Sequence, residues 1–270
     1  MPLNKITSLT NARVKDIIQL RNRKQRAETG LTIVEGHREI ARALEAGVPF
    51  KELYLCRDYI DDEQAGELIA SVKASIYETT KSVYSKISYG DREEGLLAVC
   101  GPQPASFNDI VSKAQLFIVI VEGVEKPGNL GAILRTCDGA GVDGMIICDE
   151  QTDIYNPNVI RASLGTVFSV KVAVSTNEET FKFLKSKNVK VCATFPQARA
   201  VYTEEKLTGA IAVVAGSEQS GLTDFWTRHA DLKVRIPMKG YADSLNVSAS
   251  TAILLYEIIR QRSIYSASQK

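Results

Sequence analysis

Short β-branched apolar runs alternate with helical patterns along the chain, and this alternation constrains the fold more than any other feature. Residues 211–216 and 232–236 are such runs, and the segments that follow them, 222–229 and 248–262, have the periodicity of helices. Strands separated by helical crossovers imply a mainly parallel sheet with helices on both faces. The sequence therefore predicts an α/β protein.

The length of 270 residues suits two domains, and the composition changes once along the chain. Residues 1–100 read as a small α/β module in which 11–28 has the pattern of a single basic amphipathic helix. Residues 101–113 contain prolines and small polar residues without periodicity, as a linker does. Residues 114–270 resume the alternation with a more apolar character. We expect a domain on each side of the linker.

Composition excludes several classes of protein. The longest apolar run, 116–121, is too short to cross a bilayer, and the amino terminus is too polar for a signal peptide. The five cysteines are scattered and there are only two histidines, which argues against a disulfide framework and a structural zinc site. We expect a cytoplasmic protein without a metal, whose thiols are reduced and mostly buried.

The amino-terminal region is strongly basic although the net charge of the whole chain is only +1. Between Lys5 and Arg26 there are seven basic residues and one acidic residue, Asp16. Such a segment suits the phosphate backbone of a nucleic acid, and a solvated helix face is the equally balanced alternative.

Two strand ends in the last third of the chain are polar. AVVAGSEQSGL (212–222) and VRIPMKGYADSLNVSAS (234–250) each run from an apolar strand through a small-residue turn into a helical pattern. The carboxyl ends of strands in an open α/β sheet are where its ligands bind. The two segments are therefore expected to converge on one ligand site.

The loop GVEKPGNLGAILRTCDGAG (123–141) does not fit the common nucleotide-binding signatures. A phosphate-binding loop would need Lys and Ser or Thr where Asn129 and Leu130 stand. The glycines at 139, 141 and 144 match a dinucleotide motif by spacing, but they follow a helix and precede a strand, which reverses its required context. Asn129 could simply cap the helix.

Two arginines stand out within helical patterns. Arg135 lies in the apolar stretch AILRTC, where an unpaired buried guanidinium would be costly, so we expect it to meet an anion. Arg161, in NPNVIRASLG, raises the same question. Either a structural carboxylate or a bound phosphate would serve. The occurrence of two such arginines in one domain favours an RNA phosphate site.

Three motifs together resemble a known family. GNLGAILRT, AVVAGSEQSGL and RIPMKGYADSLNVSAS, in this order and spacing, are similar to the signature motifs of the SpoU/TrmH branch of the SPOUT RNA methyltransferases. NPNVIRASLGTVFSV resembles the segment between them, and the match covers about residues 116–262. Residues 4–44 resemble the ribosomal-protein-like substrate-binding domain that often precedes this catalytic domain.

The resemblance implies a fold and an activity. It implies a homodimeric SPOUT domain with a trefoil knot near the carboxyl terminus, preceded by an RNA-binding domain. The implied reaction transfers a methyl group from S-adenosylmethionine to a ribose 2′-hydroxyl of structured RNA. The additional domain favours 23S ribosomal RNA as substrate, with transfer RNA as the alternative.

The resemblance also assigns residues. The catalytic set would be Arg135, Asn129, Glu218, Ser244 and Asn246. The cofactor would be bound by Thr194, Gly216, Ile236, Met238 and Leu245. The resemblance and the charge pattern together predict RNA contacts from Arg21, Arg23, Lys24, Arg26 and Arg161.

Two other functions compete with this interpretation. A non-catalytic RNA-binding protein could keep the fold and lose the chemistry, although the intact motifs argue against it. The second alternative is a metabolic α/β enzyme with another nucleotide cofactor. The glycine signatures in this sequence argue against it, because they lie in the wrong structural context.

Overall fold

The structure of the protein is a computed structural model that describes residues 4–90, 94–111, 115–217 and 219–267. It divides into two compact units. The first comprises Met1–Gln103 and Asp153–Ser169, and the second comprises Pro104–Thr152 and Val170–Lys270. The sequence placed all of 114–270 in one domain, whereas contacts in the structure group 153–169 with the amino-terminal residues.

The first unit is built on a mixed five-stranded sheet of order β1-β4-β3-β5-β2. The strands β1, β4 and β3 are parallel, and β5 is antiparallel to both of its neighbours. The strands are β1 (Asn4–Ile6), β2 (Thr32–Glu35), β3 (Phe50–Leu55), β4 (Ser75–Thr79) and β5 (Leu96–Cys100). The helices of this unit are α1 (Ala12–Gln19), α2 (Arg23–Thr29), α3 (His37–Glu45), α4 (Asp62–Ser71), α5 (Lys81–Ile87) and α7 (Pro157–Ala162).

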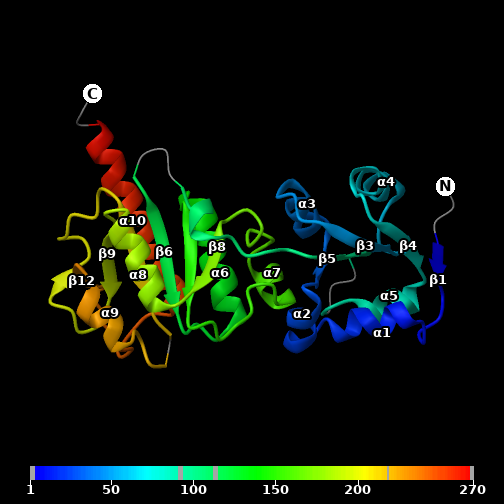
Figure 1. Ribbon diagram of the computed structural model, residues 1–270, viewed down its shortest axis with the longest axis horizontal. Helices are drawn as coiled ribbons and strands as arrows, with labels where there is room; N and C mark the ends of the chain where they lie inside the picture. Colours follow the sequence, from blue (N-terminus) through cyan, green and yellow to red (C-terminus); the bar gives the residue numbers. More distant parts are fainter. Residues whose placement is uncertain (1–3, 91–93, 112–114, 218, 268–270) are drawn as a thin grey trace. The chain divides into compact units, whose positions relative to one another are not determined.

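Helices cover both faces of this sheet. Figure 1 shows α1, α2 and α5 on one face, and α3 and α4 on the other. The core on the first face joins α1 and α5 to the sheet through buried residues that include Val14, Ile17, Val83 and Tyr84. These residues recur at helical spacing, so each helix buries one apolar stripe.

The single helix expected over 11–28 is wrong, because the chain breaks after α1 and starts again at α2. The side-chain oxygen of Asn22 accepts a hydrogen bond of 2.8 Å from the backbone N–H of Lys24, so Asn22 caps the second helix. Asparagine favours this position because its side chain satisfies an otherwise unpaired N–H of the first turn. The first helix ends at Gln19, three residues before this cap.

The second unit is built on a seven-stranded sheet of order β10-β12-β9-β11-β6-β7-β8, and every neighbouring pair is parallel. The strands are β6 (Phe117–Glu122), β7 (Gly144–Cys148), β8 (Val172–Ser175), β9 (Lys190–Thr194), β10 (Ala200–Val201), β11 (Ile211–Ala215) and β12 (Leu232–Arg235). The central strands β6 and β11 are buried along their whole length. Their continuous apolar runs are typical of strands covered on both faces.

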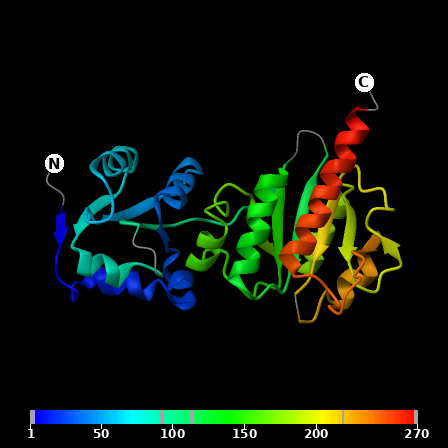
Figure 2. The ribbon, with the colours of Figure 1, turned by 180° about the vertical axis from the view of Figure 1, so that it is seen from behind.

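Helices again cover both faces, as the alternation in the sequence predicts. They are α6 (Pro127–Ala140), α8 (Asn177–Ser186), α9 (Asp224–His229) and α10 (Val247–Ala267). Figure 2 shows α6 and α10 side by side on one face of the sheet, and Figure 1 shows α8 and α9 on the other. The predicted α/β class with a mainly parallel sheet is confirmed.

Two further features of the structure concern membrane-spanning helices and groups of metal ligands. Within the ranges that the structure describes, no helix combines the length and apolarity needed to cross a membrane. In the same ranges, no three His, Cys, Asp or Glu side chains are grouped as metal ligands would be.

Candidate active site

A pocket of about 450 Å³ lies where β9, β11 and β12 end. Its walls come from the segments that follow these three strands, because parallel strands bring their carboxyl ends to one edge of the sheet. The five residues predicted to bind a cofactor all line it, namely Thr194, Gly216, Ile236, Met238 and Leu245. A pocket of this size accommodates a molecule of several hundred daltons.

The segment after β11 is a tight turn held by its own backbone. Ser217 and Gly221 exchange two backbone hydrogen bonds, of 3.2 and 3.1 Å. A Cβ atom at Gly216 would lie 2.3 Å from the carbonyl carbon of Gly221, so only glycine fits. Gly216 is one of the residues expected to bind the cofactor, and it also lines the pocket. The close contact that requires a glycine here is with Gly221 of the same turn.

Asn246 and Asn129 join two of the three motifs. The side-chain amide of Asn246 donates to Oδ1 of Asn129 at 3.1 Å. Oδ1 of Asn246 accepts from the backbone N–H of Ser248 at 2.9 Å, which caps α10. The contact links the start of α6 to the start of α10.

This pair of contacts fixes the orientation of both amides. The backbone N–H of Ser248 can only donate, so it requires the oxygen of Asn246 and leaves the nitrogen to face Asn129. Asn129 must then accept through its oxygen. Its own Nδ2 is buried and has no hydrogen-bond partner among the described residues. A buried donor without a partner is costly, and such groups concentrate at functional sites.

Arg135 lies on the exposed face of α6, which contradicts the expectation that it is buried against an anion. The buried residues of α6 are Leu130, Gly131, Ile133, Leu134 and Cys137, and Arg135 falls outside this stripe. It forms no ion pair with any residue of the described ranges. Its guanidinium is therefore available to an external anion. Arg135 is not among the residues that line the pocket.

The other predicted catalytic residues divide between the pocket and its border. Ser244 is exposed and lines the pocket. Asn129 and Asn246 lie beside it through the contact described above. Glu218 lies outside the described residues.

Two of the predicted RNA-binding arginines are occupied within the first unit. The side chain of Arg26 is 4% exposed, and its Nε donates to Asp153 at 2.7 Å. Its Nη1 donates to the carbonyl oxygens of Leu20 and Arg21, both at 2.9 Å. Arg26 is a buried structural residue, so the prediction that it contacts RNA is not supported by its position.

The side chain of Arg21 also donates hydrogen bonds to backbone carbonyl oxygens, at the end of a helix. Its Nη2 donates to the carbonyl oxygens of Lys86, Ile87 and Ser88, of which the last is 2.7 Å away. These carbonyls lie at the end of α5 and have no partners within the helix. Arg21 therefore caps α5, and its position favours a structural role.

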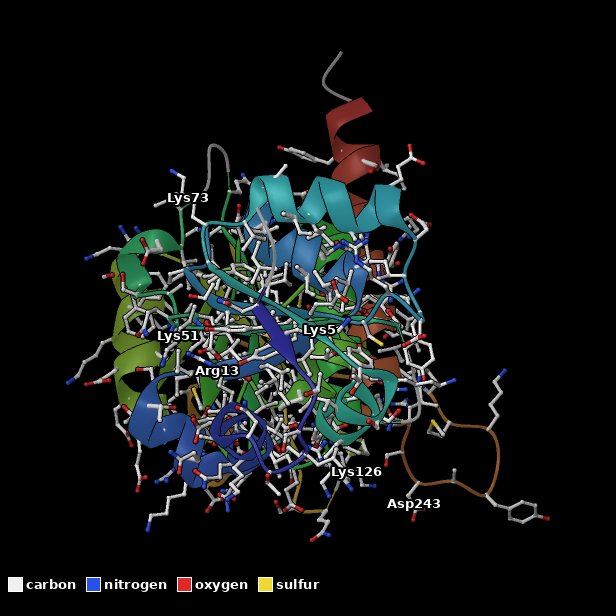
Figure 3. The ribbon with its side chains drawn as sticks, turned by 90° about the vertical axis from the view of Figure 1, so that its right-hand side faces the viewer. Lys5, Arg13, Lys51, Lys73, Lys126 and Asp243 are labelled. Carbon is white, nitrogen blue, oxygen red and sulfur yellow. The ribbon has the colours of Figure 1, made fainter. Side chains whose placement is uncertain are left out.

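The remaining predicted cations are more accessible. Arg23 and Lys24 are exposed on α2. Arg161 is half-buried in the first unit, where its Nη1 donates to the carbonyl of Tyr89 at 3.5 Å. Lys5 and Arg13, which are among the cations labelled in Figure 3, are both ion-paired, with Glu78 and Glu52 respectively.

Sequence reasoning missed Glu122, which organises the edge of the sheet. This buried carboxylate at the end of β6 accepts hydrogen bonds from the backbone N–H and the hydroxyl of Thr223, both at 2.8 Å. It also accepts one from the side chain of Asn177, which in turn accepts from Nε1 of Trp226 at 2.9 Å. Thr223 follows the segment that lines the pocket, so Glu122 anchors that segment. An acid that ends the apolar run FIVIVE was the available signal.

A parallel sheet with a pocket at its carboxyl edge, bordered by loops from separate strands, defines an α/β protein that binds a small organic ligand. The sequence narrows this class to one family. The chain belongs to the SpoU rRNA methylase family, whose sequence model matches residues 116–256. The MRM3-like substrate binding domain matches residues 11–98. The resemblance identified from the three motifs is confirmed.

Relatives of known function are similar over most of their length. The 23S rRNA (guanosine(2553)-2′-O)-methyltransferase RlmP of Bacillus subtilis is 28% identical, over 95% of this chain and 99% of its own. The 23S rRNA (guanosine-2′-O-)-methyltransferase RlmB of Escherichia coli K12 is 30% identical, over 79% of this chain and 91% of its own.

Solved structures agree with this assignment. A crystal structure of an RNA 2′-O ribose methyltransferase is 37% identical, with a TM-score of 0.84 over 95% of this chain and 98% of the other. The AdoMet-bound rRNA methyltransferase of Sinorhizobium meliloti is 31% identical, with a TM-score of 0.88 over 96% of this chain and 98% of the other.

Proposed function

We propose that this protein is an S-adenosylmethionine-dependent methyltransferase that acts on a ribose 2′-hydroxyl of 23S ribosomal RNA. The observation that carries the proposal is the pocket at the ends of β9, β11 and β12, which gathers residues from two of the three family motifs. The substrate-binding domain at residues 11–98 supports RNA as the second substrate.

The residues of the pocket fit the cofactor. Ile236, Met238 and Leu245 supply apolar walls, and the segments after the strands carry backbone amides and carbonyls outside the sheet ladder. Such a mixture suits a ligand that joins an adenine, a ribose and an amino acid. When bound, S-adenosylmethionine supplies a methyl group that is electrophilic because it is attached to a sulfonium.

We assign Arg135 to the RNA rather than to the cofactor. Its guanidinium is exposed on α6 and suits bidentate contact with a phosphate next to the reacting ribose. Guanidinium groups remain protonated in proteins, so Arg135 would act as a cation that stabilises charge developing on the 2′-oxygen. Water or a neighbouring group would accept the proton of the hydroxyl.

Asn129, Ser244 and Asn246 would order the same site. Nδ2 of Asn129 has no partner within the described part of the chain and would donate to an oxygen of the substrate. Ser244 lines the pocket from the loop that ends at Asn246. Glu218 is assigned to the same group by its place in the second motif.

The first unit would hold the RNA, with Arg23 and Lys24 as the exposed contacts on α2 and Arg161 as a third. Phosphate contacts of this kind position a substrate without reading its sequence. We further propose the division expected from the sequence, with an RNA-binding domain before the linker and a methyltransferase domain after it.

The family resemblance extends the proposal to assembly and location. We propose a homodimer formed through the second unit, in which α10 carries the half-exposed Tyr256 on its surface. A trefoil knot near the carboxyl terminus and a cytoplasmic location complete the proposal. Sedimentation velocity of the purified chain tests the dimer.

The central experiment has two stages. Calorimetry with S-adenosylmethionine tests the pocket, and 2′-O-methyl mapping of total RNA from cells with and without the protein identifies the substrate. We expect one 23S rRNA position to lose its methyl group without the protein. A lost position in transfer RNA would redirect the proposal, and cofactor binding absent together with an unchanged methylation map would favour the non-catalytic alternative.

A further inference from the structure

The loop between β12 and α10 has two sides of different character. Its ends line the pocket through Ile236 and Met238 on one side and Ser244 and Leu245 on the other. Its tip, residues 239–242, is exposed at every position and does not line the pocket. Figure 3 shows the loop around Asp243 standing out from the ribbon of the second unit. The tip is therefore at the border of the pocket and free of the fold.

Tyr241 lies at this tip and nothing in the described chain covers it. Its relative exposure is 108%, whereas no other large apolar side chain in the described ranges exceeds 71%. Its neighbours are Gly240 and Ala242, and a Cβ atom added at Gly240 would meet no atom within 4 Å. A single exposed apolar residue is common on protein surfaces. This one stands at the tip of a loop whose two ends line the pocket, so it is placed to contact a substrate that approaches the pocket.

The proposed reaction places a demand on the RNA that such a ring can meet. Stacked RNA presents its 2′-hydroxyls in a shallow minor groove, so a ribose enters a concave pocket most closely when its nucleotide leaves the stack of its neighbours. The base then loses its stacking partners, and an aromatic side chain can replace one of them whatever the base. Lys239, two residues away and also exposed, adds a positive charge suited to the adjoining phosphate.

We propose that Tyr241 is a substrate-positioning residue that stacks on an RNA base beside the reacting ribose, with Lys239 at the neighbouring phosphate. The proposal rests on the function proposed above and deepens it, because it assigns the border of the pocket to the RNA. It also gives the loop two roles, with one side for the cofactor and its tip for the nucleotide.

The test compares three substitutions of Tyr241. Tyr241→Phe keeps the ring, Tyr241→Leu keeps apolar bulk without it, and Tyr241→Ala removes both. With transcribed 23S rRNA and saturating S-adenosylmethionine, we expect the phenylalanine variant to stay within about twofold of the original KM for RNA. The leucine and alanine variants should raise that KM by about tenfold or more, the range of a lost base–aromatic stack. Cofactor affinity and urea stability should stay unchanged in all three.

Other outcomes would overturn the proposal. A leucine variant as good as phenylalanine would show that the ring does not stack. A lower sedimentation coefficient of the leucine variant would mean that Tyr241 contacts a second copy of the chain. A loss of cofactor affinity would assign the tip to the cofactor wall.

Filter binding of the same transcript separates this proposal from the proposed function. If the original protein binds the transcript but does not methylate it, the enzymatic function fails and the affinities of the phenylalanine and leucine variants still decide the role of Tyr241. If the original protein does not bind the transcript, both proposals fail.

Discussion

The side-chain amide of Asn246 donates to Oδ1 of Asn129 while the oxygen of the same amide caps α10. One substitution separates these two tasks. Asn246→Asp keeps an oxygen for the cap, since aspartate caps helices as well as asparagine does. It removes the donor toward Asn129, whose amide would then turn and present Oδ1 where Nδ2 now lies.

We therefore expect Asn246→Asp to lower the rate of methyl transfer by about 100-fold or more, as loss of an aligned donor does. Urea unfolding should be nearly unchanged. Asn246→Ala is the matched comparison, because it should lose the same activity and also about 1 kcal/mol of stability with the cap. Full activity of the aspartate variant would show that the contact with Asn129 has no part in the reaction.

Arg135 should matter to the reaction and not to the fold. Because its side chain is exposed, Arg135→Ala should change stability by no more than about 0.5 kcal/mol. The rate of methyl transfer should fall by at least about 100-fold through loss of charge stabilisation. Calorimetry should give the original affinity for S-adenosylmethionine. A parallel loss of cofactor affinity and rate would contradict the assignment of Arg135 to the RNA. The Arg135→Lys variant keeps the charge without the bidentate geometry, so its rate shows how much of the rate depends on that geometry.

Breaking the ion pair between Arg26 and Asp153 should destabilise the first unit. Removing one partner of a buried pair costs about 3–5 kcal/mol, because the other charge stays buried alone. Asp153→Ala should therefore lower the free energy of unfolding, measured in urea, by about that amount. Lys24→Ala on the same helix as Arg26 is the control, since its side chain is 83% exposed. Equal stability of the two variants would mean that Arg26 finds solvent when its partner is removed.

The exposed cations of α2 should contribute to RNA binding through charge. The double variant Arg23→Gln, Lys24→Gln should weaken binding and flatten its salt dependence, because each phosphate contact adds about 0.7–0.9 to the logarithmic slope. Filter binding at several salt concentrations measures this slope. The control is Lys182→Gln, Lys187→Gln, which changes the net charge equally at exposed positions of the second unit. An identical slope in both double variants would assign α2 to solvated surface.

The thiols should be unreactive in the folded protein. All five cysteines are free and buried. Burial raises the pKa of Cys100, Cys148 and Cys192 to about 12, and it also raises the pKa of Cys56 and Cys137. Only the thiolate reacts, and a raised pKa leaves little of it at pH 8. We expect an aromatic disulfide reagent to label no thiol in native protein and all five in denaturant. Rapid labelling of one thiol in native protein would locate a local opening.

The parts of the fold that depend on local pattern were predictable. The apolar runs of β6 and β11 and the strand-end loops after β11 and β12 are visible in the sequence because burial on both faces requires continuous apolar residues. The strand β1 was missed because only Ile6 of its three residues is buried, and its place depends on pairing with β4. Such long-range pairing leaves no local pattern.

For two residues, the sequence pattern was misinterpreted or gave no information about their surroundings. Arg135 has apolar neighbours in sequence, but the buried stripe of α6 passes through Leu134 and Cys137 and leaves Arg135 outside it. Counting helical positions would have predicted its exposure. Arg26 looked like one more cation of a basic segment, and nothing near it in sequence announces Asp153 as its partner, 127 residues away.

The grouping of 153–169 with the amino-terminal residues has a consequence for how this protein can be divided. The polypeptide passes between the units after Gln103, after Thr152 and after Ser169. A protease that cuts once between them leaves two covalent connections, so the halves stay joined. A chimaera that exchanges the amino-terminal portion with that of a relative would have to carry the distant segment along, or leave Arg26 of the transplanted piece without its counter-charge.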